Sequence, residues 1–436
     1  MENSRLGQLL ANLSPVELRA FDRFLQSPYF NLRSDVYELF QTIRSGLRVR
    51  EPLPERGNVF RSAFPEKQLA DSEQHLLMNY LVKLFEQFIQ IEQLNRNPDL
   101  EDWLRVKALH RLGLTQERNK AIKKAFQRLE KSDLRSAAYH EQRYRLRYEQ
   151  LRQNREQPEE NARHLKELTQ MLNSTLVVMW LRQASFLLSE KAVYNMDSDT
   201  WFLPEIFRWV ETGDHISIPA VGAYYYACKM LLTGEEHWFQ YLKNTLEIHS
   251  TGFPPEELYD LHLMAINYCV RQLNAGKEYY FQEIHELYKA GLESKTLLNN
   301  GVLAPLTYFN IVVSGLKVKD LDWVAWFIPQ YKNSLERRYR DSAYSFNMAR
   351  LHYARHEYGE ALLLLQKANY RDMLTNLAAK TLMLKIYYEQ GAQEVLRSHL
   401  EAMEHYLRRK RVIRLSPGKL PEHHPCHETP LVAAGQ

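Results

Sequence analysis

Apolar side chains recur every three or four positions along most of the 436-residue chain, which predicts an all-helical protein. The first clear helix shows how the pattern is punctuated. Ser14 can cap the helix, Pro15 takes its first position and Glu17 completes a capping box. The apolar residues that follow share one helical face: Leu18, Phe21, Phe24 and Leu25. Pro28 disfavours helical backbone angles in the residue before it, so the helix is predicted to end there.

Three further segments are predicted in the N-terminal third. A second short helix is expected after Asn31, which can cap it, so residues 1–49 are predicted to form a small helical cap. Its apolar positions are Val36, Leu39, Phe40 and Ile43. Residues 50–66 are rich in proline and contain a glycine, which predicts a linker or an irregular loop. Residues 67–155 are predicted to be helical, with an apolar stripe that includes Leu77, Leu81, Leu84, Phe85 and Phe88 and a basic face further along.

From residue 156 to residue 413, helical patterns alternate with short turns such as "ETGDH" and "NAGKE", and no alternating strand pattern is present. Helix pairs joined by short turns over this length predict an α-solenoid, in which each helical hairpin buries its apolar face against its neighbours. Residues 414–436 are Pro-rich and aperiodic, and they are predicted to be disordered.

Composition agrees with a folded helical protein. Hydrophobic residues at 45% and charged residues at 25% are ordinary values for a globular chain. The 16 glycines and 17 prolines are too few for the many tight turns of an all-β protein. The 26 tyrosines suit helix interfaces in which one end of each ring stays in water.

An internal repeat lies near the C-terminus. The segment "NMARLHYARHEYGEALLLLQKA" aligns with "TLMLKIYYEQGAQEVLRSHLEA" at an offset of 34 residues, which is the tetratricopeptide period. The first unit resembles a tetratricopeptide repeat because Ala349, Ala361 and Ala368 are small where the two helices approach closely. It departs from that pattern at Ser345, where tryptophan is favoured, and at Met373, where proline is favoured.

Over most of its length the chain resembles a group of uncharacterised, tetratricopeptide-like helical proteins from Bacteroidetes-type bacteria. The segments that carry the resemblance are "FLQSPYFN", "LNAGKEYYFQEIHELYKAGLE", "TYFNIVVSGL", "DWVAWFIPQYKNSL" and "KIYYEQG". The resemblance implies a fold and a bacterial source, and it implies no activity.

The resemblance also implies where a partner would bind. In tetratricopeptide arrays the first helix of each pair lines a groove that holds extended peptides or partner helices. Carried over by position, the groove residues are Phe346, Asn347, Arg350 and Tyr353 in one unit and Lys380, Leu384 and Tyr387 in the next. This mixture suits a peptide of acidic character. An alternative remains open, in which the chain's own C-terminal helix fills the groove.

Charge is distributed unevenly, although the net charge is only +4. Between Arg105 and Arg155 the chain has 15 Lys and Arg residues against five Asp and Glu. Neighbouring basic helices could follow a phosphate backbone, which gives an alternative function in nucleic-acid binding. The residues of this alternative are Lys120, Lys123, Lys124, Arg128, Arg143, Arg145, Arg147 and Arg152. A solvated face balanced by acidic surface elsewhere is the favoured explanation.

No catalytic, cofactor or metal site is predicted. His352 and His356 are spaced as metal ligands on a helix, but Tyr353 stands where the H-E-x-x-H motif has glutamate. The "HHPCH" segment (His423, His424, Cys426 and His427) has metal-binding side chains but no surrounding structure to fix them. Neither a G-x-S-x-G motif nor a phosphate-binding loop is present.

The expected location is the cytoplasm. The N-terminal sequence does not match a signal peptide, no apolar run reaches the ~20 residues of a membrane span, and the three cysteines are scattered. We therefore expect a non-enzymatic cytoplasmic scaffold that binds a protein or peptide partner, with nucleic-acid binding as the alternative. The identity of the partner and the oligomeric state stay open.

Overall fold

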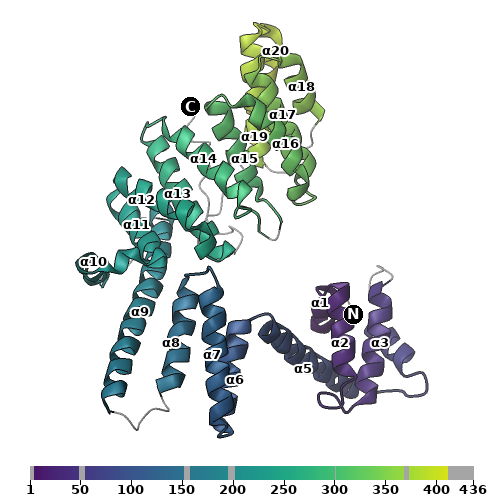
Figure 1. Cartoon of the computed structure of the whole chain (residues 1–436). Coiled ribbons are helices and arrows are strands. Elements are labelled where there is room, and N and C mark those ends of the chain that lie inside the picture. Colours follow the sequence, from purple (N-terminus) through teal and green to yellow (C-terminus); the bar gives the residue numbers. More distant parts are fainter. Residues whose placement is uncertain are drawn as a thin grey trace. The chain divides into compact units, whose positions relative to one another are not determined.

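The computed structural model describes residues 4–48, 55–151, 158–194, 202–299, 301–367 and 373–410 (Figure 1). Within these ranges the chain forms helices α1 to α20 and no β-strand, which confirms the all-helical prediction. None of the described helices is both long enough and apolar enough to cross a bilayer. Residues 414–436, including His423, His424, Cys426 and His427, lie outside the described part.

The chain divides into two compact units, Met1–Gln127 and Arg128–Gln436. The helices of the first unit are α1 (Arg5–Ala11), α2 (Pro15–Leu25), α3 (Ser34–Arg48), α4 (Arg56–Ala63), α5 (Asp71–Asn95) and α6 (Pro98–Arg111). Helix α7 (Thr115–Lys131) contains the boundary.

The predicted capping box at the start of α2 is confirmed. The Glu17 backbone N–H donates to Ser14 Oγ at 3.3 Å, and the Ser14 N–H donates to the Glu17 carboxylate at 3.0 Å. Glu17 also accepts a hydrogen bond from Arg96 at 2.7 Å. Bonding to Arg96 and to Ser14 lowers the pKa of Glu17 to about 2. The box therefore joins the start of α2 to the end of α5.

The apolar face of α2 lies at the centre of the first core. Phe21 is fully buried, and its ring centroid lies 5.1 Å from that of Phe40 in α3. It also lies 5.6 Å from Phe85 and 5.1 Å from Phe88, both in α5. Helices α1 to α5 therefore share one core. The sequence prediction placed these helices in separate segments, 1–49 and 67–155, although they share one core. Hydrophobic periodicity does not show which helix packs on which.

Two local predictions in this unit are wrong. The irregular loop expected at 50–66 contains α4, which is held by the buried side chains of Val59 and Phe60. Asn31 does not cap the next helix, which begins at Ser34. Instead its buried amide donates to the backbone carbonyls of Leu25 and Arg33 at 3.0 Å each. Asn31 therefore ties the end of α2 to the approach to α3.

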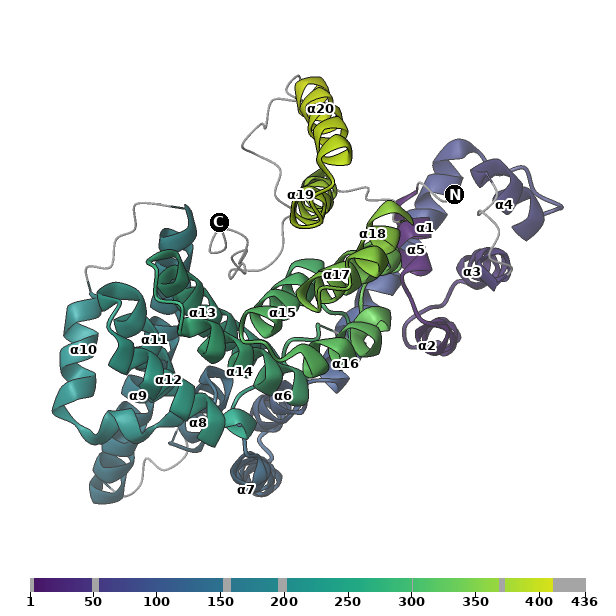
Figure 2. The ribbon, with the colours of Figure 1, turned by 90° about the horizontal axis from the view of Figure 1, so that it is seen from above.

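The second unit begins with α8 (Ala137–Leu151), α9 (Pro158–Tyr194), α10 (Leu203–Thr212), α11 (Pro219–Thr233), α12 (Glu236–Ile248), α13 (Pro255–Asn274) and α14 (Tyr280–Glu293). It continues with α15 (Pro305–Lys317), α16 (Leu321–Tyr331), α17 (Arg340–Ala354), α18 (Tyr358–Lys367), α19 (Met373–Glu389) and α20 (Gln393–Lys410). From α11 onward each helix packs on the next one. In Figure 2, α11, α13, α15 and α17 lie in one row and α12, α14 and α16 in a second.

The 34-residue repeat coincides with two helix pairs, α17–α18 and α19–α20. The small residues Ala349 and Ala361 are both fully buried where α17 meets α18. Two tyrosines differ from the expectation that one end of each ring stays in water. Tyr224 and Tyr308 are fully buried, and their hydroxyls donate to Glu257 at 2.8 Å and to the Ile328 carbonyl at 2.7 Å.

We expect Phe21→Ala to lower the free energy of unfolding by about 3–5 kcal/mol, because it removes a fully buried ring from the aromatic centre of the first core. Urea unfolding followed by circular dichroism measures the change. Leu32→Ala is the control, since Leu32 is 86% exposed and its removal should cost less than about 0.5 kcal/mol. Equal losses in the two variants would contradict the assignment of this core.

Candidate functional site

The predicted groove residues of α17 do not face an open groove. Phe346 is 3% exposed and Asn347 is 1% exposed, so neither side chain is available to a partner. The Phe346 ring stacks on Phe309 of α15 at 5.7 Å, and the Arg350 guanidinium lies 4.6 Å from the Phe309 ring. Burial lowers the pKa of Arg350 to about 10. The Tyr353 hydroxyl donates to Glu389 of α19.

The groove residues of α19 contact the chain's own last helix. Lys380 Nζ lies 5.6 Å from the ring of Tyr406 in α20, and the Tyr387 ring meets that of His399, also in α20, at 5.6 Å. Leu384 is half-buried. The seven positions carried over from the resemblance therefore do not line one open surface. Helix periodicity gave the register of α17 and α19, but it could not show that neighbouring helices cover these faces.

The basic segment is partly neutralised. Lys120 pairs with Glu117 at 2.8 Å, and Arg145 and Arg147 pair with Glu141 and Glu167. The side chains of Lys123, Lys124 and Arg143 are exposed, and that of Arg128 is half-buried. Arg152 lies outside the described residues.

The two spaced histidines do not converge. His352 Nδ1 lies 2.5 Å from the Glu357 carboxylate, whereas His356 Nδ1 lies 2.9 Å from the Tyr358 hydroxyl. Among the described residues, no cluster of three or more His, Cys, Asp or Glu side chains is arranged to hold a metal ion.

A serine, a histidine and an aspartate meet at the junction of α14, α15 and α16. His285 Nδ1 lies 3.3 Å from Ser314 Oγ, and His285 Nε2 lies 3.2 Å from the Asp320 carboxylate. A nucleophilic serine must reach a substrate and give its proton to the histidine. Here Ser314 is fully buried and donates to the Ile311 carbonyl at 2.8 Å, so this group joins three helices and has the geometry of a structural contact.

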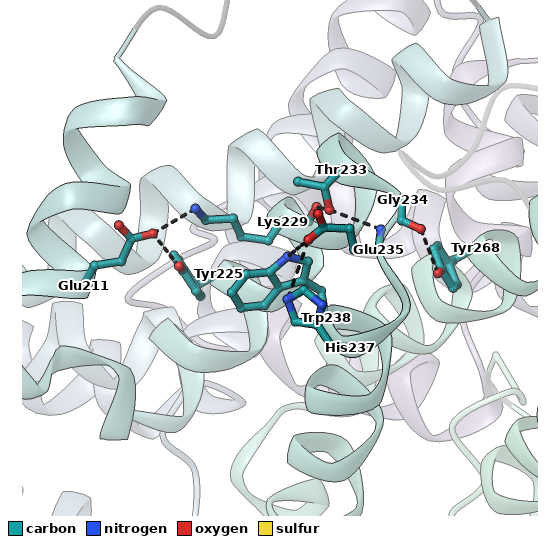
Figure 3. Close-up of polar contacts among 9 residues, drawn as sticks. All are labelled: Glu211, Tyr225, Lys229, Thr233, Gly234, Glu235, His237, Trp238 and Tyr268. Atoms are coloured by element: carbon teal, nitrogen blue, oxygen red, sulfur yellow. Dashed lines mark hydrogen bonds and ion pairs between the residues drawn. The ribbon is translucent and has the colours of Figure 1, made fainter.

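The ammonium of Lys229 lies among aromatic rings of α10, α11 and α12, and Figure 3 shows Lys229 with Glu211, Tyr225 and Trp238. Lys229 Nζ lies 4.5 Å from the ring centroid of Phe207, 5.3 Å from Tyr225 and 5.7 Å from Trp238. The same ammonium donates to Glu211 at 2.8 Å, and the Tyr225 hydroxyl donates to the same carboxylate at 2.6 Å. Hydrogen bonds from Lys229 and then Tyr225 lower the pKa of Glu211. Three rings and a carboxylate thus surround one cation.

The cluster continues onto the surface. Tyr226 stacks near Trp238 at 6.1 Å and lies 5.3 Å from Tyr241, which is 51% exposed. The Trp238 indole N–H donates to Glu235 at 3.1 Å, and His237 Nε2 lies 3.7 Å from the same carboxylate (Figure 3). We call Phe207, Tyr225, Tyr226, Trp238 and Tyr241 the aromatic face.

Local geometry holds the aromatic face in place. A Cβ at Gly222 would lie 2.9 Å from the Ile216 carbonyl oxygen, so the absence of a side chain lets α11 pack closely on the segment that follows α10. Gly234 ends α11 in the left-handed conformation (φ 70°), and its carbonyl accepts from the Tyr268 hydroxyl of α13 at 3.0 Å. The turn that brings Trp238 back over α11 is therefore anchored to the core.

The sequence analysis missed the aromatic face. The signal is present in "GAYYYACKMLLTGEEHWFQYL", where six aromatic residues lie close to acidic residues and a lysine. Periodicity alone assigns such rings to a core, and only the packing of α11 and α12 leaves Tyr241 and part of Trp238 at the surface.

We expect Gly315→Ala to lower the free energy of unfolding by about 1–3 kcal/mol, because the added methyl group would meet Val324 and His285 in a filled core. Gly359→Ala is the control. No atom lies within 4 Å of its added Cβ, and alanine favours the helix there, so stability should stay level or rise by up to about 1 kcal/mol. Chemical unfolding of both variants measures the difference, and a loss at Gly359 as large as that at Gly315 would refute the packing argument.

The buried His140 of α8 predicts a pH dependence. Burial, with Arg143 and Arg135 nearby, lowers the pKa of His140 from 6.5 to about 4. The unfolded chain therefore binds this proton at a higher pH than the folded chain, so protonation of His140 favours unfolding. The free energy of unfolding is at its full value above pH 6.5 and decreases as the pH falls toward 4. Between pH 7 and pH 5 the loss is about 2 kcal/mol.

His140→Gln should remove that part of the pH dependence in urea unfolding. His405→Gln, at an exposed position on α20, is the control and should leave the profile of the wild type unchanged. A wild-type profile in His140→Gln would show that His140 already titrates normally in the folded protein.

Comparison with known proteins gives no family. No protein-family model matches the chain, and neither a curated protein nor a solved structure is significantly similar to it. We therefore argue its function from its own side chains and surfaces.

Proposed function

We propose that this protein is a non-enzymatic, cytoplasmic scaffold of tetratricopeptide-like helical hairpins, and that it binds a protein partner through the aromatic face. The proposed repeat architecture is supported by the ordered packing of α11 to α20 and by the 34-residue units that coincide with α17–α18 and α19–α20. The bacterial origin implied by the sequence resemblance belongs to the same proposal.

The observation that carries the proposal is the partial exposure of clustered rings beside carboxylates. Rings such as Tyr224 and Tyr268 are fully buried in this unit, whereas Tyr241 is 51% exposed and its neighbour Trp238 is partly exposed. Aromatic residues are enriched in protein interfaces because they bury much area at little cost in side-chain entropy. A surface of this kind is more typical of a binding site than of a solvated helix.

The chemistry of the face favours a cationic partner segment. Lys229 already demonstrates within this chain that these rings and Glu211 hold an ammonium group. Glu235, which is 57% exposed at its side chain, lies beside the outer part of the face. An arginine or lysine from a partner could stack on Tyr241 and pair with Glu235, since cation–π and ionic contacts act together here. We therefore propose a basic partner segment, in place of the acidic peptide that the groove residues suggested.

The nucleic-acid alternative has weaker support. Its exposed residues are Lys123, Lys124 and Arg143, whereas Lys120, Arg145 and Arg147 are already engaged with carboxylates. Phosphate binding depends on cations that are free to release their counterions, so pairing within the chain reduces the favourable term.

Binding of short synthetic peptides tests the proposal. We expect fluorescein-labelled, arginine-containing peptides to bind the wild-type protein more tightly than matched peptides with citrulline in place of arginine. Tyr241→Ala should weaken binding about two- to fivefold, the effect of losing one exposed cation–π contact. Fluorescence anisotropy measures the dissociation constants.

Tyr388→Ala is the matched control, because Tyr388 is 73% exposed on α19 and lies outside the aromatic face. It should leave affinity unchanged. If arginine and citrulline peptides bind alike, or if both tyrosine variants lose the same affinity, the proposal fails. Salt-sensitive binding of DNA or RNA that charge reversal at Lys123, Lys124 and Arg143 abolishes would favour the alternative instead.

A further inference from the structure

Helix α9 has an outer face that the described part of its unit leaves largely open, although the ring of Trp180 lies 5.6 Å from that of Phe202. One side of this long helix packs on α8 and α11. On the other side Leu176 is 47% exposed, Met179 is 45% exposed and Trp180 is 42% exposed. From Leu168 to Leu181 the sequence contains no charged residue. A solvated helix face normally carries charges, so this uncharged stretch points to an interface.

The spacing on this face is that of a coiled-coil seam. The seam residues are Leu165, Thr169, Leu172, Leu176, Met179 and Gln183, and none of them is buried. They are separated by four, three, four, three and four positions. Alternating spacings of three and four place side chains where a second helix can receive them as knobs in holes. At a rise of 1.5 Å per residue the seam is about 27 Å long.

The order of these spacings allows the second helix to be another copy of α9. The series reads the same in both directions, so the seam matches its own reverse. In an antiparallel pair centred at position 174, Leu172 meets Leu176 of the second copy, Thr169 meets Met179, and Leu165 meets Gln183. Every seam residue thus meets another seam residue, which is the requirement for a two-fold symmetric interface.

The residues beside the seam agree with this register. Two copies of Asn173 come together next to the two-fold axis, where their amides can bond to each other. Lys166 comes beside Trp180 of the second copy, so a cation meets an exposed indole and not a like charge. Both Lys166 and Asn173 are exposed in the single chain.

We propose that α9 pairs antiparallel with α9 of a second copy of this chain, and that the protein is a homodimer. The buried side of α9 is opposite the seam. In each copy the helices that pack on α9 therefore lie on the side away from the partner helix. The dimer does not depend on the aromatic face, which is on α10 to α12.

The mass of the full-length protein in solution tests the dimer. Light scattering after size exclusion should give twice the chain mass for the wild type. Leu176→Glu, which places a charge at the centre of the seam, should weaken the dimer at least about tenfold. Gln170→Glu adds the same charge to an exposed position of α9 outside the seam and should leave the dimer intact. Far-ultraviolet circular dichroism confirms that both variants fold.

Disulfide trapping tests the register in a Cys426→Ser background, in which the remaining Cys228 and Cys269 are buried. Leu165→Cys and Gln183→Cys, each alone, should not form cross-linked dimers, because the two thiols of one variant would be about 27 Å apart. A mixture of the two variants should cross-link. Cross-linking of each variant alone, but not of the mixture, would indicate parallel helices and overturn the proposal.

Two other results would also overturn it. One is a wild-type protein that stays monomeric at all concentrations. If the thiol of Leu176→Cys in that monomer is also shielded from reagents, another part of this chain covers α9. The other is a dimer that Leu176→Glu leaves as tight as the wild type.

Discussion

Every helix of the second unit has an apolar face that it cannot bury by itself, and this constraint sets how the unit is built. Helix α13 shows the constraint at its limit, since nearly all of its residues from Leu258 to Val270 are buried between neighbouring helices. Each further helix covers its predecessor and presents a face that the next helix must cover. The faces left uncovered in this series are the places where function is to be sought.

Polar groups inside the stack are bonded to specific acceptors, and these bonds fix how neighbouring helices meet. Tyr224 of α11 donates to Glu257 of α13, Tyr308 of α15 donates to a carbonyl of α16, and His285 of α14 bridges Ser314 and Asp320. A buried hydroxyl or imidazole without a partner would cost more than the bond itself contributes. The triad-like His285 group therefore belongs to the packing of α14, α15 and α16.

The aromatic face and the seam of α9 are two exceptions to complete burial, and their chemistry differs. The aromatic face combines rings with carboxylates and already holds the Lys229 ammonium, which suits a basic partner segment. The seam is uncharged and aliphatic at its centre, and its spacing equals its own reverse, which suits a second copy. The aromatic face therefore suits a partner of opposite charge, and the seam suits a two-fold symmetric pair of identical helices.

The sequence by itself determined the helical class, the capping box at Ser14, the apolar faces of the first helices and the 34-residue helix pairs, because these depend on neighbours along one helix. Only the tertiary structure decided that α5 shares a core with α1 to α4, that Phe346 and Asn347 are buried, and that α20 contacts Lys380 and Tyr387. It likewise decided that Tyr241 remains at the surface. A helical period specifies which side chains share a face, but which faces are covered depends on contacts between helices that are distant in sequence.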